Sequence, residues 1–171
     1  MPRLLAIYLN DHLAGATAGL ELARRAAASN EGTALGERLA SLARELDEDR
    51  ETLRAIMERL DVGEDRLKRS AGWVAEKVGR LKPNGQIVGY SPLSRMIELE
   101  GLHVGIAGKL SLWQVLRETA GDSLAEFELE ELIARAERQR GEVEPLRLEA
   151  AGEAFAAERP ADAPEPGPRA G

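Results

Sequence analysis

The sequence predicts an all-α protein: an antiparallel four-helix bundle with a fifth, C-terminal helix and a disordered tail. Ala, Leu, Glu and Arg are its commonest residues and aromatic residues make up only 4% of the 171, a composition typical of helical proteins. Apolar residues recur at spacings of three and four, with no convincing run of period two. The chain is long enough to bury a hydrophobic core without disulfides.

Composition and charge narrow the function classes. The net charge is −7, and the 31% of charged residues have both signs interspersed, which argues against nucleic acid and against an anionic membrane surface as partners. The absence of cysteine removes disulfides, thiolate catalysis and cysteine zinc sites, and suits a cytoplasmic protein. We expect no signal peptide in MPRLLAIYLNDH and no membrane span.

The first half of the chain predicts three helices. The first, residues 2–29, ends at the break Ser29-Asn30-Glu31-Gly32, and the second covers 33–60. A short turn at 61–63 leads to the third, 64–81. The second helix has the clearest heptad seam, with one polar member: Leu39, Leu42, Leu46, Asp49, Leu53, Ile56 and Leu60.

The fourth predicted helix, 91–119, follows a loop at 81–92 in which Ile87, Val88 and Tyr90 should cap one end of the core, with a partner contact as the alternative. Ser91 is a predicted N-cap and Pro92 a first helical residue. One apolar stripe comprises Met96, Leu99, His103, Ile106, Leu110 and Trp113; the other comprises Leu93, Ile97, Val104 and Val115. A helix apolar on two faces is expected to pack on two sides, so we place it centrally.

The fifth predicted helix covers 124–140, with Ser123 as its cap. Gly141 and Pro145 should break or bend it, and a further helical stretch is expected to reach Phe155. The Pro-rich residues 158–171 are predicted to be disordered, which leaves one helical domain at 1–157.

Four ionisable residues fall where core is expected when each helix advances about 100° per residue. They are His12, Asp49, Glu100 and His103. Charged groups are rarely buried without partners, so each should be paired. Four other glutamates point away from the apolar faces and are interpreted as solvated: Glu21, Glu48, Glu76 and Glu98.

Hairpin geometry predicts one of these pairs. His12 lies 19 residues before Glu31 and Asp49 lies 18 after it, so an antiparallel hairpin places both at nearly one height. Glu100 and His103 share a helix face at i and i+3. Whether the two pairs form one site or two is left open by the sequence.

The inward Glu-x-x-His of ELEGLH resembles the ferritin-like superfamily, whose bundles carry di-metal sites built from glutamates and Glu-x-x-His motifs. The order of helices is similar to the YciF-type stress-protein branch. The stretch LDEDRETLRAIMERL has Asp49 where that family shows a histidine, and His103 stands where glutamate is more frequent. The resemblance implies a metal site with an incomplete ligand set.

Two hypotheses on function follow. The first is a non-enzymatic bundle, acting as a scaffold or stress-associated factor, in which the four residues form a structural polar network. The second is an iron- or manganese-binding protein in which His12, Asp49, Glu100 and His103 hold a mononuclear or degenerate dinuclear site. P-loop, GxGxxG and nucleophile-elbow motifs are absent, so enzymatic activity is not expected. The acidic run FELEELIARAERQRGEVE is a solvated face or, alternatively, a homo-oligomer or protein contact.

Overall fold

The computed structural model describes residues 3–64 and 90–156, and nearly all of them are helical. The elements are α1 (Arg3–Ser29), α2 (Ala34–Arg59), α4 (Pro92–Ala120), the 3-10 helix η1 (Gly121–Phe127) and α5 (Leu129–Ala156). The all-α fold and the antiparallel four-helix bundle are confirmed. The bundle consists of the first, second, fourth and fifth predicted helices, so the last predicted helix is one of the four and not an addition to them, and the described residues contain no fifth long helix. The third predicted helix and the tail at 158–171 lie outside the described residues.

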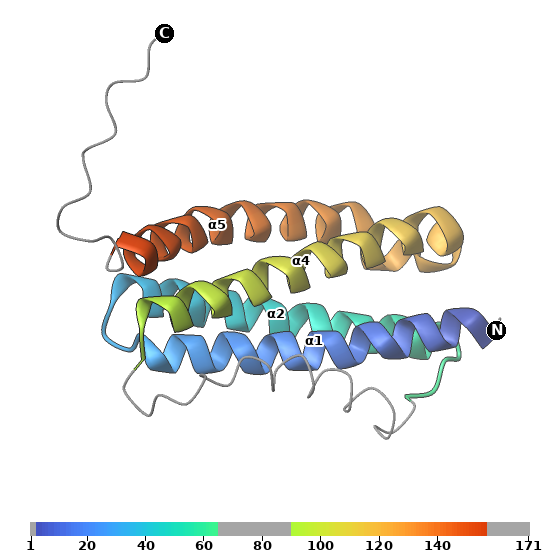
Figure 1. Ribbon diagram of the computed structural model, residues 1–171. Helices are drawn as coiled ribbons and strands as arrows, with labels where there is room; N and C mark the ends of the chain where they lie inside the picture. The colour runs from blue at the N-terminus through green and yellow to red at the C-terminus, as the bar shows by residue number, and fades with distance from the viewer. Residues whose placement is uncertain (1–2, 65–89, 157–171) are drawn as a thin grey trace, which may run out of the picture.

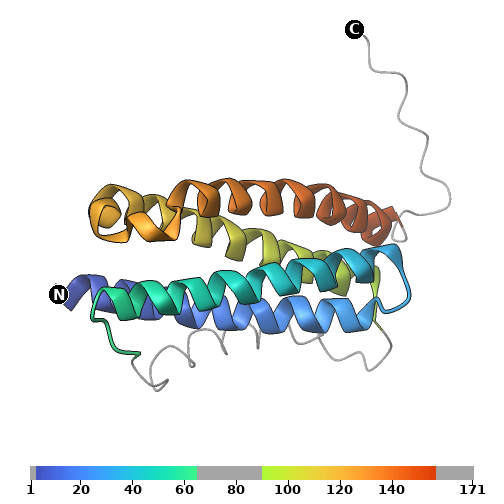
Figure 2. The ribbon, with the colours of Figure 1, turned by 180° about the vertical axis from the view of Figure 1, so that it is seen from behind.

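The bundle consists of two helical hairpins stacked on each other (Figures 1 and 2). α1 packs closely on α2, α4 packs closely on α5, and α1 also contacts α4. Neighbouring helices run antiparallel: Arg25 of α1 pairs with Glu98 near the start of α4, and Arg95 pairs with Glu153 near the end of α5. α2 and α5 approach less closely than these pairs, and long polar side chains bridge them.

The connection between α2 and α4 joins opposite ends of the bundle. The side chain of Asn10, near the start of α1, donates to the carbonyl of Gly63 at 3.2 Å, whereas Asn30, after the end of α1, donates to the hydroxyl of Tyr90 at 2.8 Å. The chain therefore leaves one end of the bundle after α2 and begins α4 at the other. As a result α2 and α4 run in the same direction on diagonally opposite sides of the core.

Local sequence signals place the helix starts. The Thr33 hydroxyl accepts a hydrogen bond from the Gly36 N–H at 3.1 Å, and the Ser91 hydroxyl accepts one from the Ser94 N–H at 3.1 Å. Each satisfies a backbone donor that has no partner within its helix. The predicted cap at Ser91, with Pro92 in the first helical position, is confirmed.

The core has the predicted heptad form. All seven seam residues of α2 are buried, including Asp49. Burial of an aliphatic side chain contributes about 1.5–3 kcal/mol, so this seam is a large part of the driving force for folding. Where α1 and α4 cross, a Cβ on Gly101 would lie 2.9 Å from Leu22 Cδ2, the end of a flexible side chain, so an alanine there would require the Leu22 side chain to shift.

The C-terminal helix differs from the prediction at both ends. It begins at Leu129 instead of residue 124, because Glu128 adopts a left-handed conformation (φ 45°) that separates α5 from η1. The predicted break at Gly141 and Pro145 is wrong, because one helix continues through both residues to Ala156. The predicted further helical stretch to Phe155 is thus present, as part of the same helix. Pro145 lies on the exposed side, and Val143 and Ala150 are buried on either side of it, so packing overrides the helix-breaking tendency of proline.

The prediction that the second apolar stripe of α4 is packed against another helix is wrong for the described residues. Leu93, Val104 and Val115 are exposed, and none of the described helices covers them. The reason is that α1 and α5 both approach α4 from the side of its first stripe, where Leu99, Ile106 and Trp113 are buried. None of the described helices is long and apolar enough to cross a membrane.

A candidate polar site between α2, α4 and α5

Asp49 lies at the centre of a buried network of charged side chains. Its side chain is only 3% exposed. The Lys109 ammonium of α4 donates to Oδ2 of Asp49, and the Arg135 guanidinium of α5 forms an ion pair with Oδ1. The carboxylate is therefore neutralised by two cations, one from each helix of the opposite hairpin.

A buried amide completes the network. The Gln139 side chain of α5 is fully buried; its Oε1 accepts from the Lys109 ammonium, and its Nε2 donates to Oε2 of Glu45 at 2.8 Å. Toward the surface, Arg138 donates to the same Glu45 oxygen at 3.1 Å and Arg135 donates to Glu48 at 3.2 Å. The network thus runs from the core to solvent with three carboxylates and three cations in balance.

Helix register brings these residues to one height. Asp49 lies 15 residues after Ala34, the first residue of α2, and Lys109 lies 17 after Pro92, the first of α4. Since α2 and α4 start at the same end and each residue advances about 1.5 Å, the two side chains meet across the core. Lys109 also continues the buried α4 positions Leu102, Ile106 and Trp113 at heptad spacing.

Burial changes the chemistry of Lys109. Loss of water contact lowers the pKa of its ammonium, while the negative charge of Asp49 acts in the opposite direction. Removing either partner would leave a charge in a region of low dielectric, which is strongly destabilising. Because the Asp49 carboxylate is paired with two cations and the Lys109 ammonium with Asp49 and Gln139, the arrangement suits fixation of helix pairing rather than proton transfer.

Asp49 and His12 do not pair, contrary to the prediction. Asp49 turns toward α4 and α5, while the His12 ring contacts Tyr8, one turn earlier on α1, with ring centroids 4.5 Å apart in an edge-to-face arrangement. The inward positions of α1 are taken by Leu9 and Leu13, which leaves His12 half-buried at the edge. The two side chains point in different directions, so the predicted pair is wrong.

Because His12 is partly buried, we predict that the free energy of unfolding depends on pH. Burial lowers the pKa of its imidazole from 6.5, and the charge of Asp11 partly offsets this. The unfolded chain therefore binds this proton more readily, so the free energy of unfolding should fall as the pH drops from 6.5 through the lowered pKa. In His12→Gln this part of the pH dependence should vanish, as measured by urea unfolding between about pH 5 and 8. An NMR titration giving His12 a pKa of 6.5 or higher would contradict the prediction.

Glu100 and His103 lie in a separate surface cluster between α4 and α5. His103 Nδ1 lies 3.4 Å from Glu144 Oε2, and Arg147 joins Glu144, at 2.8 Å, to Glu100, at 3.6 Å. The hydrogen bond from Arg147 is the main cause that lowers the pKa of Glu144. Glu100 is exposed, so it does not lie in the core as predicted. His12, Asp49 and this cluster are therefore three separate places in the fold.

The positions of these side chains show whether they could hold a metal ion. Within residues 3–64 and 90–156, no three histidine, aspartate or glutamate side chains come together in a way that could hold a metal ion. Asp49, the most deeply buried carboxylate among the described residues, is surrounded by Lys109 and Arg135, whose positive charges oppose a metal cation. The donor set around Asp49 does not fit iron or manganese.

A second polar cluster holds one end of the bundle, and it corrects the interpretation of Glu98 as solvated. Glu98 is buried; its Oε1 accepts from Arg25 at 3.0 Å and its Oε2 from the Tyr90 hydroxyl at 3.0 Å. The same hydroxyl accepts from Asn30. Burial is the largest cause that raises the pKa of Tyr90. Tyr90 is thus held at this end of the bundle by hydrogen bonds of its hydroxyl, while its ring is partly exposed and not part of the core. Ile87 and Val88 lie outside the described residues.

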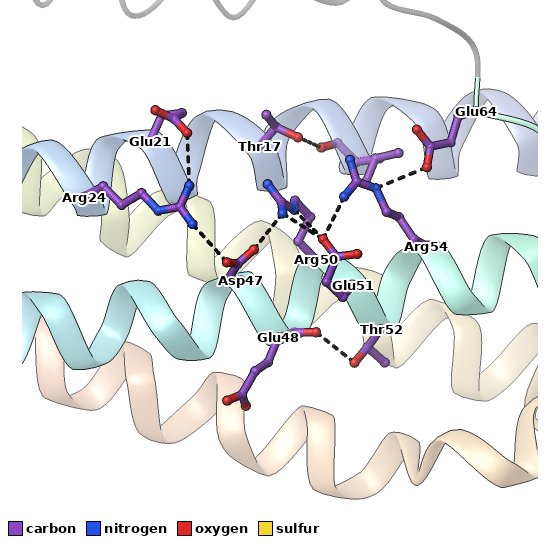
Figure 3. A network of polar contacts seen from close by, with 11 residues as sticks. Thr17, Glu21, Arg24, Asp47, Glu48, Arg50, Glu51, Thr52, Arg54 and Glu64 are labelled. Carbon is purple, nitrogen blue, oxygen red and sulfur yellow. Dashed lines mark hydrogen bonds and ion pairs between the residues drawn. The ribbon is translucent and has the colours of Figure 1, made fainter.

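The outer seam of α1 and α2 carries a row of surface ion pairs (Figure 3). Arg24 of α1 donates to Asp47 of α2 at 2.9 Å, and Arg50 joins Asp47, at 2.6 Å, to Glu51, at 2.7 Å. Arg54 extends the row toward Glu64, near the end of the described segment, at 3.1 Å. Exposed pairs of this kind contribute about 0–1 kcal/mol each, so this row matters less for stability than the buried network.

Lys109, Arg135 and Gln139 were not among the predicted site residues. Lys109 and Gln139 occupy core positions of their heptads, so their spacing from buried neighbours was an available signal. Arg135 offered no such signal, because its long side chain reaches Asp49 from a position at the edge of the α5 core.

Comparison of the chain with protein-family models, with curated proteins and with solved structures finds no match. The four-helix bundle is shown by the structure itself, and membership of the ferritin-like superfamily stays a prediction.

Proposed function

We propose that this is a non-enzymatic helical-bundle protein of the ferritin-like type, which acts through its surface as a scaffold or stress-associated factor. The observation that carries the proposal is the neutralisation of Asp49 by Lys109 and Arg135 in the middle of the bundle. In a ferritin-like metalloprotein the corresponding interior holds carboxylate and imidazole ligands. Here an ammonium and a guanidinium from the chain itself supply the positive charge.

The path of the chain supports the ferritin-like part of the proposal. Ferritin-like bundles have two antiparallel hairpins joined by one long crossover. In this chain the hairpins α1–α2 and α4–α5 are joined by a connection that runs from beside Asn10 to beside Asn30, at opposite ends of α1. This topology is a likeness of architecture, and function depends on the residues placed on it.

The alternative is an iron- or manganese-binding protein built on the predicted ligands His12, Asp49, Glu100 and His103. It requires side chains that the described residues hold in three separate places. The proposed function and this alternative differ in one measurable property, the metal content of the native protein.

Elemental analysis of the full chain, purified without a chelator or a histidine tag, tests the proposal. We expect substoichiometric iron, manganese and zinc, and no rise in melting temperature when Mn²⁺ or Fe²⁺ is added, because a bound metal would stabilise the native state by mass action. The matched variants are Asp49→Asn and the exposed Glu21→Gln. Stoichiometric metal that is retained in Glu21→Gln and lost in Asp49→Asn would overturn the proposal.

A further inference from the structure

The outer face of α1 is covered by none of the described helices. It lies opposite the buried leucines of α1 and consists of positions at heptad spacing: Leu4, Ile7, Asp11, Ala14, Ala18, Glu21 and Arg25. Leu4 is 80% exposed and Ile7 49%, and the alanines in the middle of the face are partly exposed. A helix face that meets only water is usually charged or polar, so this composition is more typical of a face that another element covers.

The connection between α2 and α4 has one end at each end of this face. Asn10 donates to the carbonyl of Gly63 at 3.2 Å, and Asn30 donates to the hydroxyl of Tyr90 at 2.8 Å. Asn10 and Asn30 are separated by about 30 Å along α1, at ~1.5 Å per residue. The chain between Gly63 and Tyr90 therefore has to travel the length of the bundle. Because α2 and α4 pack against α1, the direct route runs along the outer face of α1 (Figure 1).

The sequence of the connection suits this route. Residues 64–81 are predicted to be helical, and an amphipathic helix buries its apolar face against another element. That face comprises Leu67, Ala71, Val74, Val78 and Leu81. A helix of this length spans about 27 Å, which is nearly the whole distance between Asn10 and Asn30.

The charges of the connection and of the bundle are complementary. Residues 65–89 contain six basic and two acidic side chains, a net charge of +4 in a chain of −7, so the rest of the chain carries −11. On α1, the exposed Asp11 and Glu21 border the alanines of the outer face. Arg25, at the far end of the face, is already paired with Glu98 of α4. The outer face therefore favours a basic segment over a second copy of this acidic bundle.

We propose that residues 65–81 dock as a helix on the outer face of α1 and run in the same direction as α1. Gly63 is level with Asn10, 53 positions earlier in the chain, and two parallel helices advance at the same rate. Leu67 then lies level with Ala14, and Ala71 with Ala18. The small side chains at these levels let the two helix axes approach closely.

Hydrogen exchange of the full chain, followed by mass spectrometry, tests the docking. Amides of residues 65–81 should exchange more slowly than those of an unstructured peptide of the same sequence. Ala18→Arg places a large basic side chain against a basic segment, so exchange of 65–81 should become about tenfold faster or more. Ala134→Arg, the same change at an exposed position of α5, should leave it unaltered. Amides of α2 should keep their protection in both variants, because neither residue is in the core.

Cross-linking tests the register, because the chain contains no cysteine. With a short bis-maleimide, Ala18→Cys/Ala71→Cys should link within one molecule. Ala134→Cys/Ala71→Cys should not link, because α5 belongs to the other hairpin. A mixture of isotope-labelled and unlabelled protein separates links within one molecule from links between two.

Three results would overturn the proposal. One is exchange of residues 65–81 at the rate of the unstructured peptide. Another is exchange of 65–81 that is equally fast in Ala18→Arg and in the parent chain. The third is a failure of Ala18→Cys/Ala71→Cys to link within one molecule; links found only between labelled and unlabelled molecules would show that a second copy occupies the face. The metal content of the protein has no bearing on these results, so this proposal and the proposed function can fail independently.

Discussion

Replacement of Asp49 by leucine should lower the free energy of unfolding by about 3–5 kcal/mol, the cost of removing one partner from a buried ion pair. The variant leaves the Lys109 ammonium without its carboxylate, in contact with Gln139 and close to the Arg135 guanidinium. Urea unfolding followed by circular dichroism gives the value, and an unchanged slope would show that the same surface is exposed on unfolding.

A double-mutant cycle separates pairing from packing. Lys109→Met keeps most of the side-chain volume and should also destabilise the protein, because Asp49 then has one cation in place of two. In Asp49→Leu/Lys109→Met no charge of this pair remains buried, so the loss should be smaller than the sum of the single losses by about 1–3 kcal/mol. Arg135 can still pair with Glu48 near the surface.

The control for this cycle is Glu51→Gln on the exposed row of α1 and α2. Its carboxylate pairs with Arg50 and Arg54 but is solvated, so the free energy of unfolding should change by less than about 1 kcal/mol. Strictly additive losses in the Asp49 and Lys109 variants would contradict direct coupling between the two side chains.

The prediction of the fold succeeded where one physical signal dominated. The heptad seam of α2 is buried at every predicted position, because a continuous apolar stripe on a long helix can be satisfied only by packing against other helices. Capping chemistry at Ser91 and the break after Ser29 were also predicted, since they depend on a few neighbouring residues.

The prediction failed where distant parts of the chain decide the outcome. The continuation of α5 through Pro145 depends on packing against α4, which no local rule contains. Glu98 was interpreted as solvated from its place on one helix, yet Arg25 and Tyr90 reach it from elsewhere in the sequence. The partners of polar groups depend on neighbouring helices and on the reach of long side chains.

At the candidate site the sequence predicted the burial of Asp49 but not the identity of its partners. Asp49 was identified as a buried acid that needed partners, and it is buried and paired. Its partners were sought among histidines and carboxylates, the residue types of a metal site. The structure instead places Lys109 and Arg135 around it, which changes the interpretation from ligand to ion-pair partner.

Gly36→Ala should be the most damaging change among the glycines of the described segments. A Cβ built on Gly36 would lie 2.1 Å from the carbonyl oxygen of Asn30, a backbone atom that cannot move aside by changing rotamer. The turn between α1 and α2 would have to open, and Asn30, which donates to Tyr90, would shift with it. We expect a loss of about 3 kcal/mol, the upper end of the usual cost of overpacking.

Gly19→Ala is the matched control, and the sign of its effect should be opposite. A Cβ on Gly19, in the interior of α1, meets no atom within 4 Å. Alanine is a better helix former than glycine by about 0.5–1 kcal/mol, so the free energy of unfolding should rise by that amount. Thermal unfolding of the two variants beside the parent chain gives both signs in one experiment. Equal effects at the two positions would show that helix propensity alone, and not the close approach to Asn30, governs Gly36.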